Sequence, residues 1–265
     1  MVEDGSSDYA IELIDVVKDF DSTRVLDGLN FAVPTGAITV LIGASGAGKT
    51  VTVNHIVGLI QPTTGTVRVE GRDLAMMTEG ELNELRREMA AVLQGTLPFS
   101  CGLFFSMNVY ENVASPLRQR RPRWSSERVH AITMENLRLV GLGDNVNDMP
   151  DELSSGMAKR TAIARALALE ARIVVIDDFD SGIDGVRLAL LCDLLQEIQR
   201  ESGATFLVTT HDMSAARKLA DYAAVIHEGR IVASGEADEV FDSEEELVGQ
   251  LVAGELSGPI QLRSP

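Results

Sequence analysis

Apolar and polar positions along the chain change period several times, which indicates a mixture of strands and helices. Residues 36–42 form a short, nearly continuous apolar run rich in β-branched side chains, typical of a strand buried on both faces of a mostly parallel sheet. A glycine-rich turn follows, and the pattern over 50–57 predicts a helix that ends at Gly58. Residues 65–71 alternate between apolar and polar side chains and are bracketed by glycines, which predicts a surface strand.

Strands and helices alternate again in the second half of the chain, after a stretch, 94–155, in which helical patterns are separated by loops. Charged residues at 79–89 and apolar spacing at 125–140 predict helices, and loops between 94 and 155 contain Pro98, Pro116, Pro122 and Pro150. Beyond them, the pattern predicts a helix at 156–169, a strand at 172–176, a helix at 185–200, a strand at 204–209, a helix at 213–219 and a strand at 222–227. We therefore expect an α/β fold with right-handed crossovers and a helical insertion between its two halves.

Composition restricts the class of protein further. With 265 residues, 45% of them hydrophobic, the chain can bury the core of one large domain. Asp and Glu number 40 against 23 Lys and Arg, giving a net charge of −17, so we expect the surface to repel DNA and anionic lipid. The segment 236–246 carries seven carboxylates and no basic residue, and we expect it to form a solvated helical end.

Cysteine usage and hydropathy indicate the compartment. Cys101 and Cys192 lie far apart without a CxxC spacing, which predicts neither a disulfide framework nor a zinc site and fits a reducing compartment. The acidic N-terminal residues are not followed by the apolar segment of a signal peptide. No stretch approaches the roughly 18 uninterrupted apolar residues that a membrane-spanning helix needs. We therefore expect a cytoplasmic chain.

The first chemical motif is the glycine-rich turn at 43–50, Gly-Ala-Ser-Gly-Ala-Gly-Lys-Thr, which matches GxxxxGK[ST] between a buried strand and a helix. Glycines in such a loop let backbone N–H groups turn toward phosphate oxygens, and the helix N-terminus adds its positive end. Lys49 would reach the β- and γ-phosphates, and the Thr50 hydroxyl would ligate Mg²⁺. The alternative is a glycine-rich turn that contains a lysine by chance. The position of the motif, directly after a strand and at the start of a helix, makes this alternative unfavourable.

Two further motifs are weak signals alone and become functional candidates in combination with this loop. Asp177 and Asp178 end the apolar run 173–176, so they face the ligand crevice of a parallel sheet. Asp177 would hold Mg²⁺, and Asp178 would orient or deprotonate an attacking water. The segment 153–160, Leu-Ser-Ser-Gly-Met-Ala-Lys-Arg, precedes a helix and taken alone indicates only a serine-capped helix start.

Together and in this order, the motifs resemble the nucleotide-binding subunit of ABC transporters over nearly the whole chain. The resemblance implies a P-loop NTPase domain of the ABC type over 9–250, with a mixed sheet core, an inserted helical subdomain at about 95–155 and a C-terminal tail at 251–265. It also implies the Q-loop at Gln94, the signature at 153–157, the D-loop at 181–184 and the switch histidine at His211.

The resemblance assigns site residues position by position. It implies ATP contacts from Phe20 (stacked on adenine), Gly43, Ala44, Ser45, Gly46, Ala47, Gly48, Lys49, Thr50 and Val51, and from Ser154 and Gly156 of a second protomer. It implies Mg²⁺ ligation by Thr50, Gln94 and Asp177, and catalytic roles for Asp178, His211 and Gln94. ATP and Mg²⁺ are thus the expected cofactors, and a head-to-tail dimer is the expected assembly.

A narrower resemblance concerns the transported substrate. The segment 104–118, the Gly156-Met157 pair, Asp180-Ser181-Gly182 and the terminal 258–260 are similar to ATPases that serve Mce/Mla-type lipid importers. This implies that permease subunits bind residues about 94–118 and that the chain acts together with lipid-binding Mce-type components without contacting them directly. It also implies that the chain is a peripheral protein on the cytoplasmic face of a bacterial inner (plasma) membrane. ATPases of amino-acid importers share the main motifs and differ in such connecting segments.

Four residues depart from the family pattern. Asp178 stands where the family has its catalytic glutamate, Phe179 replaces a proline, Ser155 replaces the first signature glycine, and Gly185 replaces the D-loop proline. Together they predict slow ATP hydrolysis with the binding loop intact. The alternatives are a weakened regulatory subunit that binds ATP, or an ABC ATPase that acts in repair or translation without a permease. The single nucleotide-binding unit and the negative charge argue against the last.

Overall fold

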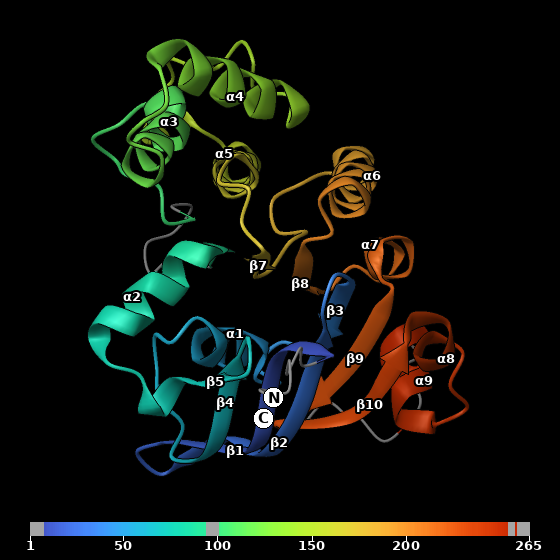
Figure 1. Ribbon diagram of the computed structural model, residues 1–265. Helices are drawn as coiled ribbons and strands as arrows, with labels where there is room; N and C mark the ends of the chain where they lie inside the picture. The colour runs from blue at the N-terminus through green and yellow to red at the C-terminus, as the bar shows by residue number, and fades with distance from the viewer. Residues whose placement is uncertain (1–7, 94–100, 254–257, 259–265) are drawn as a thin grey trace.

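The fold is a computed structural model (Figure 1) that describes residues 8–93, 101–253 and 258. A six-stranded sheet forms its centre, in the order β10-β9-β3-β8-β7-β6. Its strands are β3 (Ile38–Ile42), β6 (Met89–Val92), β7 (Ile173–Ile176), β8 (Thr205–Thr210), β9 (Tyr222–His227) and β10 (Arg230–Glu236). All neighbours are parallel except β9 and β10, which pair as an antiparallel hairpin.

The register of the central strands explains their apolar sequences. Val40 of β3 lies opposite Val208 of β8 and Ala223 of β9. Every residue of β3, β7 and β8 is buried, because helices and the second sheet cover both faces of these strands. The carboxyl ends of all three therefore meet at one edge of the sheet, and the segments that follow them lie side by side there.

A second, antiparallel sheet has the order β2-β1-β4-β5. Its strands are β1 (Tyr9–Phe20), β2 (Thr23–Pro34), β4 (Thr64–Val69) and the short β5 (Arg72–Asp73), followed by the 3₁₀ turn η1 (Leu74–Met76). Sequence analysis predicted β4 but not the long hairpin of β1 and β2. The apolar alternation of β1 is interrupted by register shifts, one between Leu13 and Val16 where Asp15 takes a positive φ of 49°, and this hides its strand character.

Most of the helices lie close to the ranges predicted for them, but residues 109–120, expected to be loop, also form a helix. The helices are α1 (Lys49–Ile56), α2 (Glu79–Glu88), α3 (Val109–Arg120), α4 (Ser126–Leu139), α5 (Ser155–Ala168), α6 (Gly185–Ser202), α7 (Met213–Leu219), α8 (Ala237–Phe241) and α9 (Glu246–Ala253), with the 3₁₀ turn η2 (Pro150–Glu152) before α5. In Figure 1, α3 and α4 form the far end of the molecule from the antiparallel sheet, and α5 connects them to the sheet edge. None of the helices in the described ranges is long and apolar enough to cross a bilayer.

The acidic segment 236–246 differs from its prediction. Rather than a solvated helical end, it contains the short helix α8, which buries Ala237, Val240 and Phe241 in the core. The Arg217 guanidinium also lies over the Phe241 ring, 5.1 Å from its centroid. The carboxylates point outward because only every third or fourth residue of this helix faces the core. The carboxylates are exposed, as predicted, but the prediction did not allow for the three apolar residues, whose spacing places them in the core.

Candidate active site

The glycine-rich loop links β3 to α1 and surrounds the side chain of its own lysine. The Lys49 ammonium donates hydrogen bonds to the Gly43 carbonyl at 2.7 Å and the Ala44 carbonyl at 3.1 Å, and only 7% of the residue is exposed. The Ala47 N–H donates to the same Ala44 carbonyl at 3.1 Å, which closes the turn. The loop therefore holds a buried cation at its centre, as an anion cradle requires.

Two of the loop glycines are required by geometry. A Cβ on residue 43 would lie 2.3 Å from the Ile226 carbonyl oxygen of β9, closer than any real contact. Residue 48 has φ = 115°, in a region that side-chain-bearing residues rarely adopt, and a Cβ there would meet Leu26 at 2.8 Å. These restrictions pack the loop against the sheet and fix where its N–H groups point.

The start of α1 is arranged differently from that of most other helices. Gly48 is its N-cap and offers no side chain to bind the free N–H groups of the first turn. Six other helices have a capping side chain: Thr78, Asn108, Ser125, Ser154, Asp184 and Asp212. The N–H groups at the start of α1 are thus available for an anion, and the helix dipole favours one there.

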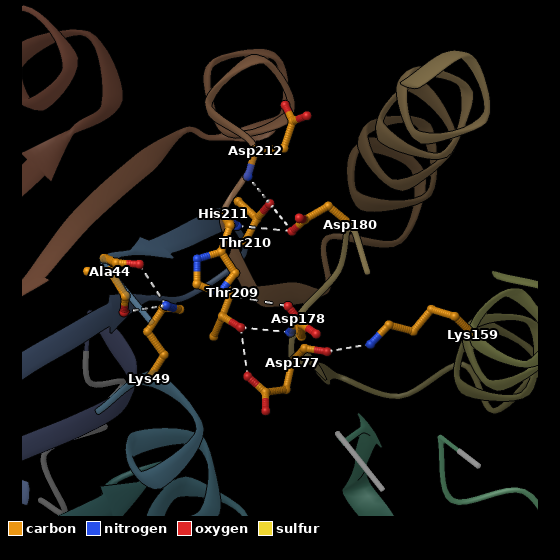
Figure 2. A network of polar contacts seen from close by, with 11 residues as sticks. Ala44, Lys49, Lys159, Asp177, Asp178, Asp180, Thr209, Thr210, His211 and Asp212 are labelled. Carbon is orange, nitrogen blue, oxygen red and sulfur yellow. Dashed lines mark hydrogen bonds and ion pairs between the residues drawn. The ribbon is translucent and has the colours of Figure 1, made fainter. Parts of the chain in front are cut away.

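A bridging hydroxyl organises the acidic residues after β7 (Figure 2). Thr209 of β8 donates to Asp177 Oδ1 at 2.7 Å and accepts from the Asp178 N–H at 2.8 Å. The Asp178 backbone takes φ = 57°, a left-handed conformation that aspartate tolerates better than most residues. One threonine therefore sets the positions of both carboxylates.

The segment after β8 brings His211 to the same place. Its N–H and the Thr210 hydroxyl both donate to Asp180 Oδ1, at 3.0 and 2.5 Å (Figure 2). The His211 ring nitrogen Nε2 lies 3.9 Å from Asp178 Oδ1, so the two side chains face each other across the ends of adjacent strands. A group between them could bond to both.

These residues line one cavity of about 480 Å³. The described residues around it are Val25, Ser45, Gly46, Gly48, Lys49, Thr50, Val51, Asp177, Asp178, Thr209 and His211. The fold thus brings together four segments that the sequence singled out: the loop, the start of α1, the acids after β7 and the histidine after β8. The volume and its mixture of cationic and acidic groups suit a phosphate-bearing ligand.

Seven predicted site residues are not among the described residues that line this cavity. Three of them, Gly43, Ala44 and Ala47, belong to the loop itself, and the carbonyls of Gly43 and Ala44 accept hydrogen bonds from Lys49. Gln94 lies outside the described residues. Phe20 ends β1 with its ring exposed and the Lys18 ammonium 5.0 Å from the ring centroid, so it is not among the described residues that line the cavity. Ser154 and Gly156, at the start of α5, are also absent from that part of the lining. A contact of these last two with nucleotide would have to come from another protomer.

Electrostatics and donor chemistry fit the expected ligands. Burial lowers the pKa of Lys49, and the nearby carboxylates, Asp177 first among them, act in the opposite direction. The second oxygen of Asp177, Oδ2, is buried and has no hydrogen-bond partner in the described part of the chain. An unpartnered buried carboxylate oxygen is costly unless a cation binds it, and the Thr50 hydroxyl lines the same cavity. The residues present therefore fit a Mg²⁺ ion.

Two residues that sequence reasoning missed hold the site together. Thr209 was recognised only as part of a strand, although a threonine at the carboxyl end of a buried strand is a signal for a polar contact. Lys159 of α5 is 2% exposed and donates to the Asp177 backbone carbonyl at 2.6 Å. A lysine on the buried face of a helix was the available signal, since such a group requires a partner.

Known proteins support this arrangement. The family profile described as ABC transporter matches residues 26–181. A Mycobacterium leprae protein named probable ribonucleotide transport ATP-binding protein mkl is 38% identical over 95% of this chain and 71% of its own length. The Escherichia coli intermembrane phospholipid transport system ATP-binding protein MlaF is 34% identical over 96% of this chain and 93% of its own.

A solved structure is also similar to this chain. The dimeric, post-hydrolysis structure of the ATP-binding cassette MJ0796 bound to ADP and phosphate has a TM-score of 0.78 and 28% identity, covering 86% of this chain and 98% of that one. The P-loop NTPase fold predicted from the sequence is thereby confirmed. This chain belongs to the ABC transporter family and is an ATP-binding, ATP-hydrolysing subunit of that family.

Proposed function

We propose that the chain powers lipid transport by an importer of the Mce/Mla type, from the cytoplasmic face of the membrane. The observation that carries the ATPase part is the convergence of Lys49, Asp177, Asp178 and His211 on one cavity. The lipid assignment is supported by the similarity to MlaF along nearly the whole of both chains. The name of the mycobacterial relative specifies ribonucleotides, so the test must distinguish the two substrates.

In the proposed site, ATP phosphates lie in the loop 43–50 and take N–H donors from the start of α1. Lys49 exchanges its two carbonyl partners for phosphate oxygens, which compensates the cost of its burial. Thr50 and Asp177 would hold Mg²⁺, which supplies charge neutralisation at the phosphates when bound. Asp178 orients or deprotonates the attacking water, and His211, 3.9 Å away, bonds to the γ-phosphate side.

The proposed active unit is a head-to-tail dimer. Ser154 is exposed and caps α5 by accepting from the Met157 N–H at 3.3 Å, so this fourteen-residue helix presents a positive N-terminal end to solvent. Placed against the cavity of a second protomer, that end would meet the γ-phosphate. ATP would then close the dimer, and hydrolysis would release it.

The proposed permease contact is the described part of the segment 94–118. Phe104 and Phe105 are 50% and 48% exposed, although most large apolar side chains among the described residues are buried. The buried Asn112 fixes them: its amide accepts from the Phe104 N–H at 2.7 Å and donates to the Phe104 carbonyl at 3.1 Å and the Met107 carbonyl at 2.8 Å. A rigid loop that presents two aromatic rings suits an apolar partner helix.

Co-expression with the membrane subunits tests this proposal. The chain should purify with them from membranes, and mass spectrometry of the extracted complex should find bound phospholipid. A complex that holds no phospholipid, but holds a ribonucleotide other than the ATP or ADP of the ATPase site, would refute the lipid assignment. Lys49→Ala should abolish ATP turnover while the complex stays assembled. Phe104→Glu with Phe105→Glu should release the chain from membranes and leave its ATP affinity unchanged. If that double variant stays membrane-bound, the permease contact lies elsewhere.

A further inference from the structure

A cluster of arginines surrounds the tryptophan between α3 and α4. The Arg128 guanidinium lies 4.1 Å from the Trp124 ring centroid, and the Arg121 guanidinium lies 5.4 Å from it. Arg123 is exposed and directly precedes the tryptophan. We call these four residues, Arg121, Arg123, Trp124 and Arg128, the Arg–Trp cluster.

The cluster has the opposite charge to the rest of the protein. Residues 118–128 contain five arginines and one carboxylate, in a chain whose net charge is −17. Two of the five are in other surroundings: Arg118 pairs with Glu111 at 2.6 Å, and Arg120 is partly buried, where the negative charges of Glu88 and Glu170 act on it. The arginines of the cluster have no carboxylate partner within the described ranges. Their positive charge is therefore uncompensated.

The geometry leaves these arginines ready to bind anions. A guanidinium that stacks on an aromatic face keeps its N–H donors at its edge, where they can bond to phosphate in pairs. Stacking also restricts the side chains before binding, which lowers the entropy cost of a contact. Arginine together with tryptophan is the composition found at the level of lipid headgroups, where the indole contacts the acyl boundary and the cations contact phosphates.

The position of the cluster favours a membrane as its partner. It follows the C-terminal end of α3, whose N-terminal end adjoins the aromatic loop of Phe104 and Phe105, and Figure 1 places this region at the outer end of the molecule. A helix of twelve residues spans about 18 Å, so both surfaces can be in use at once. If the permease holds the aromatic loop, the cluster lies close to the bilayer beside it.

We propose that the Arg–Trp cluster binds the anionic phospholipid surface of the membrane. This inference rests on the proposed function only for the location of the chain at a membrane. It refines the expectation that this acidic protein repels anionic lipid, since the cluster is a local exception to the net charge. Its role would be to orient the ATPase on the bilayer next to its permease.

The chain contains a built-in reporter, because Trp124 is its single tryptophan. Intrinsic fluorescence of the purified full chain is therefore followed while vesicles are added at low ionic strength. Vesicles of phosphatidylcholine with phosphatidylglycerol should shift the emission to shorter wavelength, and brominated acyl chains should quench it. Phosphatidylcholine alone should do neither, and high salt should reverse the change.

Matched variants separate this surface from general charge effects. Arg121→Glu, Arg123→Glu and Arg128→Glu together should weaken vesicle binding, measured by co-sedimentation, by at least about 100-fold. The control reverses three exposed arginines on other elements, Arg68, Arg87 and Arg200, changes the net charge equally, and should leave vesicle binding within about threefold of the parent. ATP affinity of both triple variants should equal that of the parent, which shows that they are folded.

Three outcomes would overturn the inference. One is emission that does not respond to anionic vesicles, and another is equal loss of binding in the control variant. The third is a cluster variant that keeps vesicle binding but loses the membrane subunits, which would assign the surface to an acidic protein segment. None of these depends on the transported substrate, and failure of the permease contact would leave the vesicle result unchanged.

Discussion

The residue at position 178 should limit the rate of ATP hydrolysis, and lengthening it should restore speed. Asp178 lines the cavity with its side chain 20% exposed, facing His211, and Thr209 fixes its backbone. Glutamate would carry the same carboxylate about 1.5 Å further into the cavity. Since a misplacement of about 1 Å can cost on the order of 10²-fold in rate, Asp178→Glu should raise kcat by up to about 10²-fold.

The structure provides room for the longer side chain. Phe179 is completely buried in the core and is not among the described residues that line the cavity, so it does not obstruct position 178. The cost appears in stability instead: φ = 57° is tolerated less well by glutamate, and we expect a loss of up to about 1 kcal/mol in the free energy of unfolding.

Steady-state release of phosphate measures the effect on kcat, and unfolding in urea measures the effect on stability. Asp178→Asn keeps the size and removes the charge, so it should abolish turnover and trap an ATP-bound dimer visible by gel filtration. If Asp178→Asn hydrolyses ATP as fast as the parent, no base or water-orienting role belongs to this residue. If Asp178→Glu is folded but no faster, side-chain length is not the limit.

Two further predictions concern the loop and the signature segment. Burial lowers the pKa of Lys49 in the free protein and bound phosphates should raise it, so ATP affinity should be full below the free-state pKa and decline as pH rises through it, beginning below the 10.5 of an ordinary lysine. Calorimetric titration across alkaline pH should show this decline, and Lys49→Arg should bind with little pH dependence. Gly156→Ala would place a Cβ 2.2 Å from the Gly182 carbonyl oxygen, so the signature and the D-loop must separate; we expect lower thermal stability and lost ATP-dependent dimerisation. Gly185→Ala, whose Cβ would meet no atom of the described residues within 4 Å, is the matched control and should behave like the parent in both measurements.

The central sheet and the phosphate loop were predictable because their signals are local. A continuous apolar run identifies a strand buried on both faces, and the eight loop residues 43–50 are contiguous in the chain, so their spacing alone identifies the motif. Among the elements that were missed, two were missed for equally local reasons. The shift at Asp15 interrupts the alternation of β1, and Pro116, taken as a loop residue, lies inside α3. Burial of Val113 and Leu117 in the core maintains that helix despite the proline.

The links between elements could not be predicted, because they depend on which strands become neighbours. Thr209 bonds to Asp177 only because β8 lies next to β7. Lys159 reaches the Asp177 carbonyl only because α5 packs against the same strand. The sequence identified the groups that carry chemistry, whereas the groups that position them became visible only with the sheet order.

The four departures from the family pattern have different consequences in the structure. Phe179 is a core residue, Gly185 begins α6 with open space around it, and Ser155 lies against Gly182 of the D-loop. Of the four, only Asp178 is among the described residues that line the cavity. Slow turnover would therefore result from the short side chain of Asp178, and not from a general loss of the catalytic residues. A regulatory subunit without catalytic purpose would gain nothing from Asp178→Glu, whereas a slow ATPase would gain speed, so the same variant distinguishes the two interpretations.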